Sequence, residues 1–401
     1  MFIFANQRIE GQILSNTIRM RKQHILVTLL IFIFFTTFSV AQHSENTHSV
    51  EVETEPHNDT THEVENDGAF DPSEMINHHI GDAHEFHIAE WNGHPITFYL
   101  PVILWTKNGL VTFSSREFHH DNDGQVVVEK KGQQFVRIHE NIYYADKAHD
   151  HPEVFDFSSR PLDFSITKNV FSMLMSLLIL FLVFSAVGRS YGKNDKAPKG
   201  LAGFMEPLVL FVRDDIAIPN IGEHKYAKFM PYLLTVFFFI WINNLIGLIP
   251  FFPFSSNLTG NIVFTGVLAL FTFILTTVNG TKDYWKHILT PDVPWLLYPI
   301  MIPIEIIGMF TKPFALMIRL FANITAGHII ILSLVSLIFI FKTWLISPVS
   351  GLFVIFMSTL ELLVAALQAY VFTLLSALFI GMAVQEHDHG HGHDEVEEAI
   401  I

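Results

Sequence analysis

A few ionisable side chains interrupt the long apolar segments near the C-terminus of this 401-residue chain. An arginine at the centre of a membrane helix costs at least about 2.5 to 3.5 kcal/mol, so charges at that depth usually serve a function. The ionisable residues in the last two apolar segments are Glu305, Lys312, Arg319, His328 and Glu361, and the notable neutral polar ones are Asn323 and Gln368. Glu305, Arg319, Asn323, His328, Glu361 and Gln368 form the candidate site, with Arg319 at its centre.

The chemistry of these side chains divides them into two classes. Histidine and glutamate can both gain and lose a proton near neutral pH, and a His–Glu pair at one depth is typical of intramembrane proton paths. Arginine keeps its proton, so Arg319 is a fixed charge rather than a relay. Facing a carboxylate of a partner helix, it would lower the pKa of that carboxylate and block a direct proton leak. Gln368 and Asn323 could hold its guanidinium by hydrogen bonds.

The spacing of these residues indicates which of them share a depth. In an antiparallel hairpin, Arg319 and Gln368 are equidistant from a point between residues 343 and 344. His328 and Glu361 are equidistant from a point between residues 344 and 345. We therefore expect each pair to lie at one level, with the second pair about 10 to 14 Å closer to the hairpin turn. His328 follows Arg319 by nine residues, so the two side chains should point in different directions.

The segments that hold these residues are apolar enough to span a membrane. The chain is 50% hydrophobic and 16% charged, whereas a soluble domain has about 25% charged residues. We predict about five membrane-spanning segments, at 170–187, 229–250, 262–278, 295–341 and 349–385. The last two exceed the ~20 residues that span a bilayer, so they must be tilted, bent or broken. Bends are predicted at Pro299, Pro303, Gly308 and Pro313.

A polar, acidic and His-rich head, residues 42–160, precedes the membrane body, residues 161–386. Residues 42–75 should be disordered. Alternating apolar and polar residues predict strands at 96–105, 110–118, 126–129 and 135–138. Asn108-Gly109 and Asp123-Gly124 supply the predicted turns. The predicted fold is thus an all-α polytopic membrane protein with a small N-terminal β-rich soluble domain.

The N-terminus resembles a secretory signal peptide. A basic segment at residues 20–23 precedes an apolar run of about 14 residues, which is short for a spanning helix, and then small residues up to Ala41. We predict a signal peptide at 1–41, cleaved after Ala41, with Met20 as a possible translation start. The alternative is an uncleaved N-terminal anchor.

The distribution of positive charges predicts how the chain is oriented across the membrane. The loop between the first two spans contains Arg189, Lys193, Lys196, Lys199, Arg213, Lys225 and Lys228, whereas residues 250–261 contain no Lys or Arg. The positive-inside rule places the first loop in the cytoplasm. The head is then periplasmic, and the tail 387–401 is cytoplasmic.

The histidines raise a second function class, a divalent metal-ion transporter. Fourteen of the 22 histidines lie between residues 43 and 151, and four more alternate in the tail at 387–393. Such histidines can bind zinc, nickel or copper. However, the spans lack paired His or Asp ligands at helical spacing, and the tail composition is also typical of a solvated, disordered end.

Other function classes find less support in the composition. The absence of cysteine excludes disulfides, thiolate metal sites and cysteine catalysis. The net charge of −15 argues against nucleic-acid binding. No nucleophile elbow, metalloprotease pair or phosphate loop supports an enzyme, and no cofactor or metal is predicted.

Two motifs resemble the hallmarks of subunit a of F-type ATP synthases. The first is the run from Lys312 to Asn323 with Ala326-Gly327-His328 after it, and the second is Glu361 followed by residues 367–372. Residues 229–232 and 244–250 resemble the second span of that family. The resemblance covers about residues 169–386 and is specific, because two motifs agree in spacing and order.

The resemblance implies a bacterial proton-channel stator subunit, which is not an enzyme on its own. Arg319 would be the family's essential arginine, His328 and Glu361 would line the outer half-channel, and Glu305 would lie toward the inner one. The implied partners are the c-subunit ring, the b-subunit peripheral stalk, the rest of the ATP synthase, the transported protons and the lipid of the inner membrane. Whether the ion is a proton or sodium depends largely on the ring.

This chain departs from the family pattern at three points. Some members carry the acid at the position of His328 and the histidine at that of Glu361. Gly247 stands where some members have an acid, and the head has no counterpart in the usual pattern. Structural alternatives are an arginine that ties helices together, a packing histidine, a packing asparagine at Asn323 and a solvated Glu305 near the interface.

Overall fold

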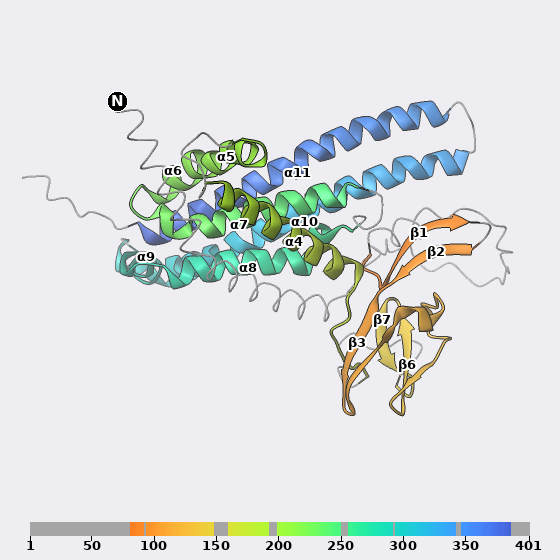
Figure 1. Cartoon of the computed structure of the whole chain (residues 1–401). Coiled ribbons are helices and arrows are strands. Elements are labelled where there is room, and N and C mark those ends of the chain that lie inside the picture. The colour runs from red at the N-terminus through yellow and green to blue at the C-terminus, as the bar shows by residue number, and fades with distance from the viewer. Residues whose placement is uncertain are drawn as a thin grey trace, which may run out of the picture.

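The computed structural model describes residues 81–91, 94–147, 159–191, 199–249, 256–291, 293–341 and 346–385. The predicted signal peptide at 1–41, the segment predicted to be disordered at 42–75 and the tail at 387–401 therefore lie outside the described residues. Figure 1 shows a bundle of long helices with a smaller β-rich head at one end. The chain passes from the head into the bundle through α4 (Lys168–Tyr191).

The head consists of three small antiparallel sheets. The first is a hairpin of β1 (Glu85–Trp91) and β2 (His94–Tyr99). The second has the order β4–β3–β8, from β3 (Pro101–Thr106), β4 (Gly109–Ser114) and β8 (Leu162–Asp163). The third contains β5 (Val128–Lys130), β6 (Gln133–Ile138) and β7 (Asn141–Tyr144). Apolar side chains of the last two sheets share one core, which includes Leu104, Phe113 and Phe135.

The predicted β-rich head is confirmed, but all four predicted strands differ in extent from the observed ones, and the first two differ most. The strand expected at 96–105 is divided at Leu100 into β2 and β3, because the buried Leu100 N–H still donates to the His84 carbonyl beside β1, whereas its carbonyl accepts from the Ser115 N–H beside β4. The strand expected at 110–118 ends as the 3-10 helix η1 (Ser115–Phe118), which the Ser114 hydroxyl caps. Strands β1, β7 and β8 were not among the predicted strands.

Among the described residues of the membrane body, four helices are long and apolar enough to cross a membrane. They are α4, α7 (Tyr226–Gly247), α10 (Tyr298–Phe341) and α11 (Ile346–Val384). A fifth candidate span is the pair α8 (Ile262–Val278) and α9 (Lys282–Leu289), which are bent by 102° at the break between them. The prediction of about five spans is therefore confirmed.

The two longest helices form the predicted C-terminal hairpin, as Figure 1 shows. Helix α10 ends at Phe341 and α11 begins at Ile346, so the turn falls where the spacing of the candidate residues predicted it. Helix α10 continues through Pro303 and Pro313, which therefore do not break it. Proline removes one backbone N–H, and membrane helices tolerate this loss where neighbouring groups satisfy the freed carbonyl.

The loop predicted between the first two spans contains further helices that the sequence analysis did not predict. They are α5 (Leu201–Phe211), the π-helical segment η2 (Val212–Ala217) and α6 (Ile218–Ile221). Buried Ile216 and Ile221 belong to the same apolar core as Ile380 of α11. At Gly381, a Cβ atom would lie only 1.9 Å from the Asn220 carbonyl oxygen, so this contact requires glycine.

We therefore expect Gly381→Ala to destabilise the membrane body by about 1 to 3 kcal/mol or more, because the added methyl group must displace the backbone of α6. Thermal unfolding of the purified subunit in detergent measures the effect. Gly351→Ala is the matched control on the same helix, since its Cβ would meet no atom within 4 Å. Equal melting temperatures for the two variants would contradict the close packing of α6 on α11.

Candidate functional site

The structure brings His328 and Glu361 into direct contact across the α10–α11 hairpin. His328 Nδ1 lies 2.5 Å from Glu361 Oε1, and Glu361 is only 6% exposed. The other ring nitrogen, Nε2, lies 3.3 Å from the carbonyl oxygen of Gly247 at the end of α7. The two residues were predicted to lie at one level because they are equidistant in sequence from the hairpin turn, and their side chains meet there.

These two contacts determine how many protons the pair holds. A carbonyl oxygen can only accept, so Nε2 of His328 must carry a proton. The short contact at Nδ1 then needs one more proton, which belongs either to the imidazole or to the carboxyl of Glu361. The pair can therefore pass this proton between its members without a change of geometry, and that is the property of a relay.

Glycine makes the close approach of the pair possible. A Cβ atom at Gly327 would lie 2.9 Å from Glu361 Oε1, so a larger residue there would push the carboxylate away from His328. Gly247 supplies a backbone carbonyl to His328, so this position serves the site through its main chain. Gly327 and Gly247 both lie within the motifs that resemble the family, but their contacts with Glu361 and His328 could not be predicted from the sequence.

Further polar residues support the same end of the bundle. The Asn244 side chain donates to the Ala365 carbonyl of α11 at 3.1 Å and accepts from the Thr259 hydroxyl at 2.7 Å. All three of Asn244, Thr259 and Ala365 are buried. These bonds tie α7 to α11 one turn from Glu361, and they were not predicted.

Arg319 lies on an exposed stripe of α10. Leu316, Leu320 and Ile324 point into the core. A neighbouring stripe of the helix is exposed and consists of Ala315, Arg319, Ala322, Asn323 and Ala326. Within the described part of the chain, the Arg319 guanidinium has no hydrogen bond or ion pair.

The remaining candidate residues do not join the His328–Glu361 contact. Gln368 is buried on α11, and in the described ranges neither Gln368 nor Asn323 donates to or accepts from Arg319. Their expected hydrogen bonds to the guanidinium are thus not formed in this chain alone. Glu305 is half-buried on α10, about 21 Å from Arg319 along the helix axis and on the side away from His328.

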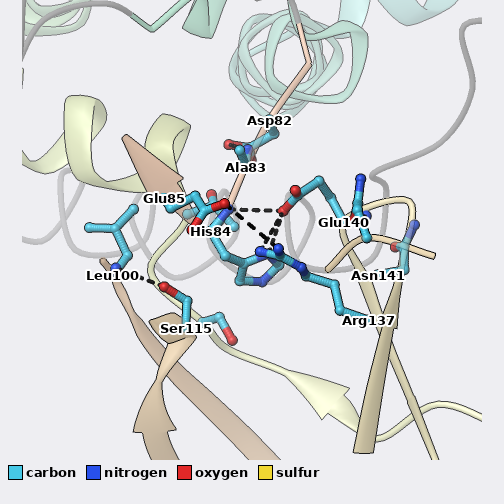
Figure 2. A network of polar contacts seen from close by, with 12 residues as sticks. Asp82, Ala83, His84, Glu85, Leu100, Ser115, Arg137, Glu140 and Asn141 are labelled. Atoms are coloured by element: carbon cyan, nitrogen blue, oxygen red, sulfur yellow. Dashed lines mark hydrogen bonds and ion pairs between the residues drawn. The ribbon is translucent and has the colours of Figure 1, made fainter. Parts of the chain in front are cut away.

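A second polar cluster, which was not predicted, lies in the head (Figure 2). His84 Nδ1 lies 3.0 Å from Glu140 Oε2, and Arg137 extends toward Glu140 and Glu85 at 3.7 Å each. Burial opposes the charge on His84, but Asp163 and Glu140 outweigh it and raise the pKa of His84 to about 10. Burial also opposes the charge on Glu140, but His84 and Arg137 lower its pKa to about 2. Both groups therefore stay charged near neutral pH and form fixed ion pairs rather than a relay.

Comparison with known families matches the two parts of the chain separately. The family model described as ATP synthase A chain matches residues 170–381. The family model described as Domain of unknown function (DUF8433) matches residues 75–164, which contain the head. The boundary between the two matches falls at the start of α4.

Curated relatives match the membrane body. ATP synthase subunit a of Chloroherpeton thalassium is 54% identical over 233 residues, which cover 56% of this chain and 68% of the relative. ATP synthase subunit a 2 of Chlorobaculum tepidum is 53% identical over 234 residues, covering 56% of this chain and 65% of the relative. ATP synthase subunit a of Myxococcus xanthus is 46% identical over 229 residues, covering 56% and 74%. The match thus spans about two thirds of each relative's length, and the chain belongs to the ATP synthase A chain family.

Proposed function

We propose that this chain is the proton-channel stator subunit of an F-type ATP synthase, and that it passes protons to and from carboxylates of the c-subunit ring. The contact between His328 and Glu361 carries this proposal. It is a buried pair in the membrane body whose members can exchange one proton, and it lies about 14 Å along α10 from an exposed, unpaired arginine. Family membership supports the same function.

The roles of the residues follow from their positions. A proton from the side of the head reaches His328 and Glu361 and passes to a ring carboxylate. When the ring brings a protonated carboxyl opposite Arg319, the fixed charge lowers the pKa of that group and drives its deprotonation. The proton leaves on the other side, where Glu305 lies further along α10. Gln368 and Asn323 would hold the guanidinium only once the ring is in place.

The exposed stripe of α10 suits a helical partner that carries negative charge. Small residues allow close approach of helices in a membrane, and Ala315, Ala322 and Ala326 flank Arg319 and Asn323 on this stripe. A carboxylate on the partner helix would supply the counter-charge that Arg319 lacks within the described residues. We infer that this stripe faces the c ring and that other surfaces of the body contact lipid and the b-subunit peripheral stalk.

The orientation that we propose places the complex in a bacterial inner membrane. The Lys- and Arg-rich loop 188–228 lies at the end of α4 away from the head, so the positive-inside rule puts the head in the periplasm. The C-terminus would then be cytoplasmic. The metal-transport alternative finds no support, because the family is that of the ATP synthase A chain and no cluster of three metal-ligating side chains occurs among the described residues.

Disulfide cross-linking tests the assignment of the ring face, because the chain contains no cysteine of its own. In the assembled complex, we expect Ala322→Cys to form an oxidative cross-link with a cysteine placed one turn from the ring carboxylate. Leu178→Cys on α4 is the matched control, since that position is also exposed, at 52%, but lies on another helix. A cross-link at Leu178 and none at Ala322 would contradict the proposed docking face.

A further inference from the structure

A series of contacts leads from the head to His328 and Glu361, with a hydrogen bond at every step except the van der Waals contact between Ser256 and Gly247. Helix α4 starts directly under the head, where the Lys168 N–H donates to the Ala83 carbonyl at 2.8 Å and Phe171 packs edge-on against Phe86 at 5.6 Å. This junction belongs to both parts of the molecule, since the rings and the backbone bonds join a strand of the head to a membrane helix. The family match to the membrane body begins at residue 170, within this junction.

Asp82 occupies the centre of the junction. Its Oδ1 accepts from the backbone N–H of Asn169 at 3.0 Å and from that of Ala83 at 3.0 Å. Figure 2 shows Asp82 and Ala83 at the edge of the ion-pair cluster, between that cluster and the helices. A carboxyl of the head is thus bonded to the first turn of a membrane helix.

The series continues from Asn169 toward the relay. The Ser256 hydroxyl donates to the Asn169 side-chain oxygen at 2.6 Å, and both residues are buried. The Ser256 carbonyl oxygen lies against Gly247, where a Cβ atom would be only 3.2 Å away. The carbonyl of Gly247 in turn accepts from His328. The head and the His328–Glu361 pair are therefore joined through residues of α4, the segment before α8, and α7.

Two buried polar groups beside this series lack a partner among the described residues. They are the Ser172 hydroxyl, one turn after Asn169 on α4, and the Asn257 side-chain nitrogen, next to Ser256. Ser172 is 1% exposed and Asn257 is 6% exposed. Buried polar groups of this kind typically bind ordered water, because leaving them unsatisfied costs about 1 to 3 kcal/mol each. Both therefore indicate bound water between the head and the relay.

We infer that the head forms the outer mouth of the proton path, with Asp82 as its outermost proton-binding group and with water held by Asn169, Ser172, Ser256 and Asn257 between Asp82 and His328. This inference rests on the proposed function and adds a site in the head to it. In the transfer, the Asp82 carboxylate takes a proton from external water. It then gives this proton to the internal water, which passes it to the His328–Glu361 pair, and Asp82 is a carboxylate again.

The charges that face Asp82 suit this role. Lys168 of α4 and His84 of the head lie close enough to favour its carboxylate, and Thr167 donates to it. Burial outweighs these contacts and raises the pKa of Asp82 above the usual value near 3.8. Asp82 can therefore bind and release a proton in a pH range in which the neighbouring His84 and Glu140 keep their charges.

The test compares gradient-driven ATP synthesis by the whole complex in vesicles as the pH on the head side is varied. In Asp82→Asn, we expect a rate about tenfold lower than wild type at alkaline external pH and little change at acidic pH. This loss is smaller than the 10²–10⁴-fold loss for an obligatory proton-transfer group, because external water can replace Asp82 when protons are abundant. Asp82→Glu should restore the wild-type profile. Glu129→Gln, at an exposed carboxylate of β5, is the matched control.

The outcomes separate this inference from the proposed function. A wild-type pH profile in Asp82→Asn would overturn the role of Asp82, and an equal loss at every pH would show a structural role instead. If Asp82→Asn does not assemble, Ser172→Ala takes its place. It should lower the rate at every pH by removing one water ligand, and an unchanged rate would overturn the water path. Glu361→Gln, measured in parallel, tests the proposed function itself, since it should stop synthesis whatever Asp82 does.

Discussion

Replacing Glu361 by Gln should lower gradient-driven ATP synthesis by about 100-fold or more, because the amide keeps the shape of the side chain but cannot bind and release a proton. Exchanging the two residues, in the double variant His328→Glu with Glu361→His, should recover a substantial part of the rate. The physical reason is that the 2.5 Å contact needs one imidazole and one carboxyl but not a particular order of the two. Synthesis rates of the reconstituted complex, normalised to the amount of assembled complex, measure both effects.

The single variants His328→Glu and Glu361→His provide the comparison for the exchange. Each has two like groups at the contact, two carboxyls or two imidazoles, so each should be as inactive as Glu361→Gln. Glu223→Gln is a matched control for loss of a carboxylate, since Glu223 is exposed between α6 and α7. If the double variant were no more active than the singles, a shared proton between these residues would not be the basis of the relay.

Replacing Arg319 by Ala should stop ATP synthesis while leaving the complex permeable to protons. In the proposed mechanism, the fixed positive charge of Arg319 forces a ring carboxylate to release its proton. Without it, protons can cross with the ring and return without driving net rotation. We expect passive proton conduction by vesicles stripped of the catalytic sector to persist, together with synthesis at the background rate.

This substitution should not disturb assembly of the subunit. Arg319 is exposed and has no partner in the described part of the chain, so its loss leaves no buried polar group unsatisfied. Lys286→Ala on α9 is the matched control, because it removes an exposed cation from another helix of the same subunit. If proton conduction and synthesis fell together in Arg319→Ala, the loss would reflect damage to the channel rather than loss of coupling.

The membrane body could be predicted well because its signals are local and strong. Apolar runs identify spanning helices, and α10 and α11 were predicted from length and hydropathy alone. Depth within a hairpin depends only on residue number and helical rise, so the meeting of His328 with Glu361 followed from the turn position. The spacing of nine residues also predicted that the Arg319 and His328 side chains point in different directions. Arg319 lies on the exposed stripe of α10, whereas His328 faces Gly247.

Contacts between segments distant in the sequence could not be predicted. The Gly381–Asn220 approach joins residues 161 positions apart, and no local pattern marks it. The division of the strand at Leu100 depends on a change of partner there, from His84 for its N–H to Ser115 for its carbonyl, which requires the tertiary fold of the head. The ion-pair cluster of His84, Arg137 and Glu140 likewise combines residues that are each unremarkable in sequence.

The partner of Arg319 is the one element of the site that neither the sequence nor the fold of this chain contains. A single intramembrane arginine usually has a counter-charge nearby, and the described residues provide none. The resemblance supplied the c ring as that partner, and the exposed stripe of small residues around Arg319 is the surface that fits it. We therefore propose that the functional unit is this stripe together with a carboxylate from another subunit.

ATP-driven proton pumping by vesicles that carry the Arg319→Ala complex tests the central claim most directly. The measurement follows acidification of the vesicle interior after ATP is added, with the wild-type and Lys286→Ala complexes beside it. If this chain couples proton flow to rotation through Arg319, the Ala variant will show no acidification above background, while both references pump. Undiminished coupled pumping by Arg319→Ala would contradict that claim.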